Sequence, residues 1–249
     1  MRRRRLSAAL AALLAASAVA VSACGGNSSG NSSKLKTYIE YVQAGSSIIT
    51  DTFAVAYDNN NRIISLTAPN LGFVYTYSDK SFTLDLYENS QLSIHEIAWL
   101  NSIPYVDSTF QYDNTSDTTT EGYVYNGNQL THETTYSYSN GVATIDTRDD
   151  YTYDNNGNGI KDVQSDGQGN VNTITTYTYT NKPLSVTIGP IYFAPGSKYL
   201  PATEQQTDGT GNPIATVTFT YEFDSSGRLT KETDTINNGE VASKTYIYE

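Results

Sequence analysis

The chain has 249 residues, of which 12% are aromatic and 16% charged, and its formal net charge is −11. Four of its 15 basic residues stand at positions 2–5, so the remainder has 11 basic against 26 acidic residues, a net charge of −15. A domain this acidic, without a basic run, repels polyanions, which excludes nucleic-acid binding and predicts repulsion from anionic lipid headgroups. The length suffices for one β domain of substantial size or two small ones.

The first 23 residues have the order of an export signal. Arg2–Arg5 form a positive segment, and Leu6–Ala20 follow as an apolar run of mostly Ala, Leu and Val. The run is shorter than the ~20 residues that span a bilayer. Charge, a short apolar run and then small residues predict a cleavable signal peptide over residues 1–23.

The end of this signal, Val21-Ser22-Ala23-Cys24, resembles the bacterial lipobox, with an ordinary secretory signal as the alternative. In that family the cysteine sulfur takes a diacylglycerol and the new amino terminus is acylated, which implies lipidation at Cys24 and a membrane anchor. Cys24 is the single cysteine of the chain. Gly25, where an aspartate would favour inner-membrane retention, implies an outer-membrane address.

Residues 24–33 continue from the cysteine as a Gly, Ser and Asn segment with nothing apolar to bury. Such a segment behaves as a flexible tether with an r.m.s. reach of about 15–20 Å. Residues 34–249 then form a domain held close to the membrane. That domain has no cysteine, so no disulfide stabilises it.

Alternating aromatic residues followed by an Asx/Gly turn recur along the domain. Aromatics at i and i+2 share one face of a strand, and Asp, Asn, Ser and Gly tolerate the backbone of a tight turn. The spacing is irregular, at about 12–30 residues, so the repeat is degenerate. The units begin at Phe53, Phe110, Tyr123, Tyr136, Tyr151, Tyr177 and Phe219.

The last unit resembles the YD repeats of Rhs-type and teneurin-type proteins, whose signature is Tyr-x-Tyr-Asp-x-x-Gly-Arg-Leu. Here Asp224, Gly227, Arg228 and Leu229 stand in register with that signature. Similar tyrosine-hairpin domains occur in Gram-negative envelope lipoproteins. The chain is too short for the toxin-enclosing shell of long YD arrays, so that function is not implied.

These patterns predict one all-β domain over residues 34–249. The expected architecture is a meandering antiparallel sheet of hairpins, strongly twisted or rolled on itself, with a two-sheet β-sandwich as the alternative. Residues 92–100 have apolar side chains at helical spacings and are interpreted as one short helix, with a strand as the alternative. Five prolines between positions 183 and 213 predict edge strands and connections.

One segment has the composition of a calcium loop. Asp154, Asn156, Asn158 and Asp162, with Asp166 beyond them, place oxygen-bearing side chains at alternate positions around glycines, as Ca²⁺ requires. The segment resembles the calcium loops of thrombospondin type 3 repeats. The alternative is a hairpin turn, which needs the same residue types for backbone reasons.

Motifs of the common enzyme classes do not occur in the sequence. His95 and His132 are the two histidines, and neither has a second ligand at zinc spacing. A carboxylate-based glycoside hydrolase needs no short motif, and Asp149, Asp150 and Glu204 are nominal candidates for it.

The leading functional hypothesis is a non-enzymatic envelope lipoprotein that binds a surface polysaccharide or an envelope protein. Exposed tyrosine rings stack on sugar rings, and neighbouring Asn, Asp and Thr can bond to hydroxyls. The alternatives are a structural or assembly component without a small ligand, and the hydrolase. A row of exposed tyrosines would favour binding, and buried tyrosines the structural role.

Overall fold

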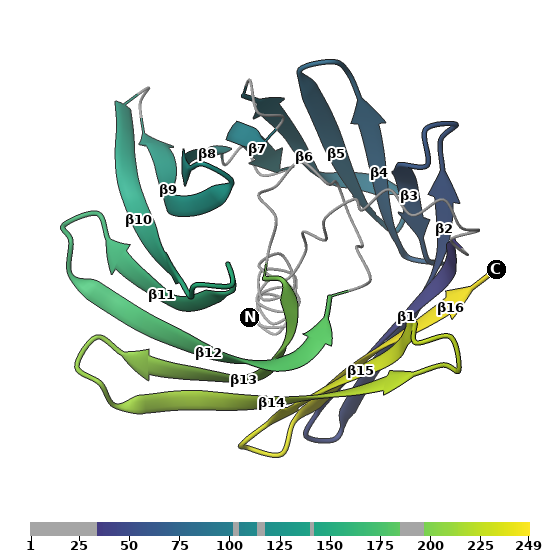
Figure 1. Cartoon of the computed structure of the whole chain (residues 1–249). Coiled ribbons are helices and arrows are strands. Elements are labelled where there is room, and N and C mark those ends of the chain that lie inside the picture. The colour runs from purple at the N-terminus through teal and green to yellow at the C-terminus, as the bar shows by residue number, and fades with distance from the viewer. Residues whose placement is uncertain (1–33, 102–104, 114–117, 140–141, 185–196) are drawn as a thin grey trace.

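The computed structural model describes residues 34–101, 105–113, 118–139, 142–184 and 197–249. The signal, Cys24 and the tether lie outside these ranges. The described residues form sixteen strands in one antiparallel sheet (Figure 1). The strands are β1 Leu35–Ala44, β2 Ser47–Tyr57, β3 Ile63–Thr67, β4 Leu71–Tyr77, β5 Ser81–Glu88, β6 Gln91–Leu100, β7 Val106–Asp113, β8 Thr118–Asn126, β9 Gln129–Ser139, β10 Val142–Tyr153, β11 Gly159–Asp166, β12 Val171–Pro183, β13 Tyr199–Asp208, β14 Pro213–Phe223, β15 Leu229–Ile236 and β16 Val241–Tyr248.

The sheet closes into a barrel because the first strand pairs with the last. Tyr38 of β1 stands opposite Tyr246 of β16, and the register continues along both strands. Each of the remaining strands pairs with the strand before it and the strand after it in the chain. The prediction of an all-β domain of antiparallel hairpins is confirmed, but the strongly twisted or rolled sheet is in fact closed into a barrel, and the alternative sandwich is wrong. Closure pairs both edge strands, which an open sheet would leave exposed.

The helix expected over residues 92–100 is wrong, because the segment lies in strand β6. Glu96 and Ala98 point into the barrel, while His95 and Trp99 point outward, which is the two-residue period of a strand. The apolar spacing that resembled a helix comes from apolar residues on both faces. No helix of membrane-spanning length and hydropathy occurs in the part of the chain that the structure describes.

The hydrophobic core lies inside the barrel, where β1–β4 meet the last strands. The rings of Tyr38 and Phe53 are 5.8 Å apart, and Tyr38 is equally close to Tyr246. Such ring pairs contribute beyond their buried area. The buried members of this cluster are Leu35, Tyr38, Phe53, Ile63, Leu66, Tyr75, Leu200, Leu229 and Tyr246.

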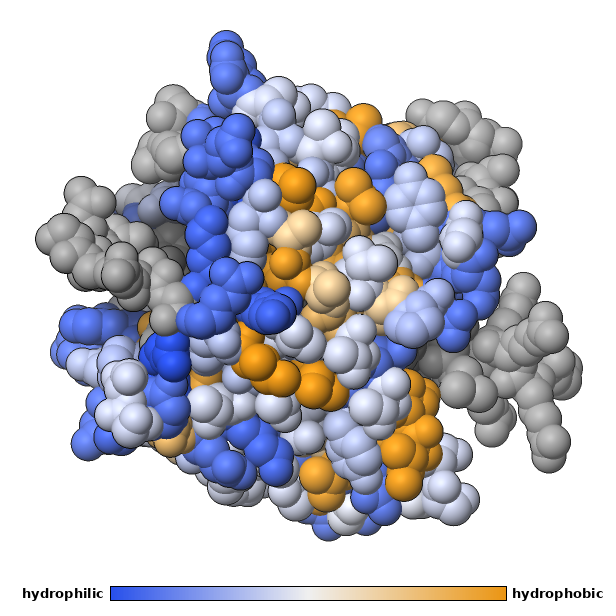
Figure 2. Space-filling model, turned by 90° about the vertical axis from the view of Figure 1, so that its right-hand side faces the viewer, coloured by the Kyte–Doolittle hydropathy of each residue, from blue (hydrophilic) through white to orange (hydrophobic). Residues whose placement is uncertain are grey.

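The outer face of the barrel is rich in threonine and serine. On β2, exposed residues alternate with covered ones, and the exposed set includes Ile48, Thr50 and Thr52. Figure 2 views the side of the barrel where β1–β4 and β16 lie, and apolar side chains appear there singly or in small groups among hydrophilic ones. This wall differs from the continuous apolar band of barrels that face lipid.

The two rims of the barrel differ in what they carry. Even-numbered strands end at one rim, which also holds both ends of the described chain, since the Glu249 N–H donates to the Lys34 carbonyl at 3.0 Å. We call this the terminal rim and the opposite one the far rim.

Aspartate-headed turns recur at both rims. In residues 224–228, Asp224 Oδ1 accepts the N–H groups of Ser226 and Arg228, and Oδ2 accepts Arg228 Nε at 2.6 Å. Gly227 adopts a φ of 77°, which glycine reaches without strain. The same carboxylate-to-backbone pattern occurs at Asp58, Asp154, Asp166 and Asp208.

A tyrosine and a β-bulge occur together at seven of the eight strand pairs of the terminal rim. At the start of seven odd-numbered strands, the pairing with the preceding even-numbered strand skips one residue, which is a β-bulge. The backbone carbonyl of the residue just before the skipped one accepts a hydrogen bond from a tyrosine hydroxyl of the following even-numbered strand, at 2.5–3.0 Å. The exception is β5, which begins without a register skip against β4 and is followed by a strand, β6, that contains no tyrosine. We call these residues the bulge tyrosines: Tyr57, Tyr77, Tyr125, Tyr153, Tyr179, Tyr221 and Tyr248.

Candidate functional site

The inner face of the barrel carries many carboxylates and one described basic residue, Lys244. Away from the rims, strand alternation and cross-strand register direct ten acidic side chains inward. So many buried carboxylates with one ammonium group cannot all be charged at low cost. The ten are Glu40, Asp51, Glu96, Glu121, Glu133, Asp149, Asp162, Glu204, Glu232 and Asp234.

Lys244 neutralises one end of this set. Its Nζ lies 2.7 Å from Glu232 Oε1 and 3.7 Å from Asp234 Oδ2. Burial opposes the charge on Lys244, but the two carboxylates outweigh it and raise its pKa. Burial also raises the pKa of Asp234, which Lys244 offsets only in part.

The wall formed by β8–β11 has inward carboxylates and no inward basic residue among those described. Glu133 stands opposite Asp149 and accepts the Tyr151 hydroxyl at 3.0 Å. Burial, with the neighbouring Glu121 next, raises the pKa of Glu133 to about 8. Burial followed by Asp149 raises that of Asp162 to about 7, and the buried Oδ1 of Asp162 has no hydrogen-bond partner among the described residues. This interior therefore takes up and releases protons near neutral pH.

The outer wall of β6–β10 carries an aromatic patch, defined as Trp99, Phe110, Tyr112, Tyr136 and Tyr138. Phe110 and Tyr136 flank Thr120 in one cross-strand row, which Ile97 and Ile145 extend on either side. Trp99, Tyr112 and Tyr138 are 42%, 40% and 44% exposed, so their rings are open to solvent.

Polar groups lie beside these rings. The His95 ring lies 5.0 Å from that of Tyr112, and its Nδ1 is 2.5 Å from Asp85 Oδ1. Thr118 stands opposite Tyr112 on the next strand. Farther along the wall His132 pairs with Asp150. Open rings beside hydroxyl, imidazole and carboxylate groups can stack on an apolar sugar face and bond its hydroxyls.

The structure does not bring the five residues of the predicted calcium loop together. Asp154, Asn156 and Asn158 belong to a terminal-rim turn, where Asp154 Oδ2 accepts the Asn158 side chain at 2.8 Å. Asp162 points into the barrel from β11, and Asp166 heads a turn at the far rim. No group of three or more His, Cys, Asp or Glu side chains that could hold a metal ion forms within the described ranges. Calcium binding stays a prediction, without a ligand cage in these positions.

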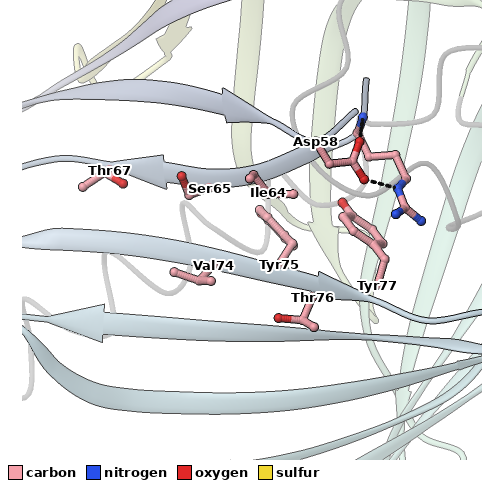
Figure 3. A pocket seen from close by; sticks show the side chains of 9 residues that line it. Asp58, Ile64, Ser65, Thr67, Val74, Tyr75, Thr76 and Tyr77 are labelled. Carbon is pink, nitrogen blue, oxygen red and sulfur yellow. Dashed lines mark hydrogen bonds and ion pairs between the residues drawn. The ribbon is translucent and has the colours of Figure 1, made fainter. Parts of the chain in front are cut away.

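The remaining sequence candidates also separate. Asp149 points inward and Asp150 outward on β10, and Glu204 points inward opposite Tyr177. His95, one of the two histidines, points outward. Two hollows in the described part of the barrel contain one carboxylate each, Asp58 and Asp154, whereas a glycosidase of the usual kind uses two. Figure 3 shows the first hollow, where Asp58 is already bonded within its own turn.

The sequence analysis did not single out the aromatic patch. The units at Phe110 and Tyr136 look like the others, yet they face outward while the units with bulge tyrosines face inward. The outward units lie on odd-numbered strands and the inward units on even-numbered ones. That distinction follows from strand direction, for which no single unit carries a signal.

Comparisons with known proteins find the fold but no family. No family model matches the sequence, and no curated protein matches it either. The chain is similar in structure to a porin-like protein from Bacteroides uniformis ATCC 8492, with 16% identity, a TM-score of 0.60, and coverage of 86% of this chain and 96% of that one. It is also similar to a porin-like protein from Bacteroides vulgatus ATCC 8482, with 12% identity, a TM-score of 0.63, and coverage of 88% and 99%. These likenesses establish a shared barrel fold.

Proposed function

We propose that this chain is a non-enzymatic lipoprotein of the cell envelope that is anchored through Cys24 and binds a polysaccharide with the aromatic patch. The exposed rings of Trp99, Tyr112 and Tyr138 beside hydrogen-bonding groups are the observation that carries this proposal. The porin-like names of the two structural neighbours are consistent with an envelope protein. The threonine-rich outer wall supports a barrel that faces water and is held to the membrane by its lipid.

A structural role is the second candidate, and the bulge tyrosines favour it. Tyr57, Tyr125 and Tyr153, like the other members of that set, point inward and bond to backbone carbonyls. Those rings build the wall and are not available to stack on a sugar. Only the outward-facing aromatics can serve recognition, so the two candidates depend on different residues.

The test is a glycan array probed with the acylated full-length chain in detergent, with calcium and again with chelator. Saturable binding to a defined polysaccharide is expected, and Trp99→Ala or Tyr112→Ala should weaken it about three- to tenfold through loss of one stacked ring. Tyr41→Ala, which removes an outward tyrosine on β1, is the matched control and should leave binding unchanged.

A blank array would overturn polysaccharide binding and leave the structural role. Binding lost in chelator would instead favour the untested calcium prediction. Binding that survives both patch substitutions would place recognition elsewhere on the barrel.

A further inference from the structure

Basic side chains gather at one end of the barrel. Of the 11 basic residues after position 33, nine lie in a turn of the terminal rim or within two residues of a strand end there. The two exceptions are Arg148 on the outer wall and Lys244 inside. The nine are Lys34, Lys36, Arg62, Lys80, Lys161, Lys182, Lys198, Arg228 and Lys231.

The far rim has the opposite composition. Its turns and strand ends carry Glu88, Asp166, Asp208 and Glu240, and no Lys or Arg in the described ranges. The terminal rim also has seven acidic residues, but three of them head turns, where their carboxylate oxygens accept hydrogen bonds from the turn itself. The net charge of −15 is therefore unevenly distributed between the two rims. The repulsion from anionic lipid that the composition predicts does not apply to the terminal rim.

Six of the rim lysines are exposed and form no ion pair among the described residues: Lys34, Lys36, Lys80, Lys161, Lys182 and Lys198. Three of these are held over aromatic rings of the same rim. Lys34 lies 5.2 Å from the centroid of Tyr57, Lys182 5.7 Å from that of Phe223 and Lys198 5.5 Å from that of Tyr199. These contacts keep ammonium groups at the rim while they remain open to an external anion.

The N-terminal segment reaches the barrel at the same rim. Lys34 precedes β1 and hydrogen-bonds to the last residue of the chain. Nine residues, 25–33, separate it from the anchor at Cys24, with a reach of about 15–20 Å. The terminal rim is thus the end of the barrel that an anchor at Cys24 brings to the bilayer.

We propose that the terminal rim docks on anionic phospholipid headgroups, with its exposed lysines against the phosphates, so that the barrel stands with its far rim away from the membrane. This inference rests on the lipid anchor of the proposed function. Each lysine near an anionic leaflet adds to the attraction between the rim and the membrane. The acids of the far rim lie about 25 Å away at strand rise, well beyond the ~8 Å Debye length, and do not oppose the contact.

The test places one fluorophore at either rim. The mature chain, acylated at Cys24, has no other cysteine, so Ser226→Cys and Gln168→Cys each give one labelling site. Both residues are exposed and hold the same place in an aspartate-headed turn, Ser226 at the terminal rim and Gln168 at the far rim. The labelled chains are reconstituted in phosphatidylcholine vesicles with and without phosphatidylglycerol, which also contain a headgroup-linked quencher.

We expect the Ser226 label to be quenched several-fold more than the Gln168 label. The difference should grow with phosphatidylglycerol and shrink in 0.5 M salt. The triple substitution Lys80→Gln, Lys182→Gln and Lys198→Gln should remove most of the dependence on phosphatidylglycerol. Single Lys80→Gln should reduce it measurably, whereas Arg148→Gln, the same charge loss on the outer wall, should not.

Two results would overturn the inference in distinguishable ways. Equal quenching of both labels, with lipid on Cys24 confirmed by mass spectrometry, would mean that the barrel turns freely on its tether, and the anchor would stand. A chain without lipid on Cys24 would contradict the anchor itself, and the docked orientation with it.

Discussion

Glu133 shows how burial determines the chemistry of single side chains in this barrel. Its carboxyl lies opposite Asp149 and accepts one hydroxyl, from Tyr151, with no basic side chain facing it among the described residues. Burial raises its pKa from the ordinary 4.5 to about 8. The folded chain thus keeps a proton on Glu133 over a pH range in which the unfolded chain has lost it. The stability from this group is complete below about pH 4.5 and is lost as the pH rises through 8.

Replacing this carboxyl by its neutral isostere should remove that pH dependence. Glu133→Gln keeps an acceptor for Tyr151, so we expect little change in stability at pH 5 and a gain on the order of 2 kcal/mol at pH 9. Urea unfolding at both pH values measures it. Glu222→Gln, on the exposed outer wall, is the control and should leave the pH dependence as it is. An equal shift at both pH values would contradict a protonated Glu133.

The hairpin that begins and ends at the terminal rim is the element that repeats through the fold. A bulge starts the odd-numbered strand, and a bulge tyrosine bonds to the carbonyl that the bulge leaves unpaired. At three of the terminal-rim turns an aspartate also caps the turn that precedes the bulge. Tyr125 bonds to the Val106 carbonyl at 2.8 Å, across the register skip at the start of β7. Because a buried carbonyl without a partner is costly, the bulge and the tyrosine belong together.

Removing a single bulge-tyrosine hydroxyl should therefore destabilise the barrel. Tyr125→Phe keeps the ring and leaves the Val106 carbonyl without its partner, and we expect a loss of about 1–2 kcal/mol in the free energy of unfolding. Tyr112→Phe removes the hydroxyl of a tyrosine that faces outward and should cost less than ~0.5 kcal/mol. Equal effects in the two variants would mean that the bulge carbonyls do not depend on these bonds.

The sequence predicted the positions of these hairpins better than it predicted which of their side chains point into the barrel. The Tyr, Asp, Gly and Leu of the last unit mark a strand, a turn and the next strand by local chemistry, and the structure has all three there. Whether an aromatic pair faces inward or outward depends on strand direction and on bulges, which are set by neighbouring strands. Tyr112 was therefore not distinguished from Tyr125. The helix prediction for residues 92–100 was wrong for a related reason, because both faces of β6 carry apolar groups.

At the scale of the whole molecule, closure depends on a contact that no local pattern encodes. β1 and β16 pair although nearly the whole domain separates them in sequence, and Ile39 stands opposite Thr245. A degenerate hairpin repeat is compatible with an open sheet, a sandwich or a barrel, because each hairpin looks alike in all three. Closure also separates a threonine-rich outer wall from an acidic interior and a basic rim from an acidic one.

The pairing of the first strand with the last is the central claim, and cross-linking tests it directly. In the full-length chain with Cys24 acylated, Ile39→Cys with Thr245→Cys places two thiols on the outer face of β1 and β16, within reach of an oxidant or a short thiol cross-linker. Ile39→Cys with Thr52→Cys joins β1 to β2 and should react in any arrangement of the hairpins, whereas Ile39→Cys with Thr120→Cys should not react. A closed barrel predicts efficient cross-linking of the first two pairs. Reaction of the β1–β2 pair alone would contradict closure.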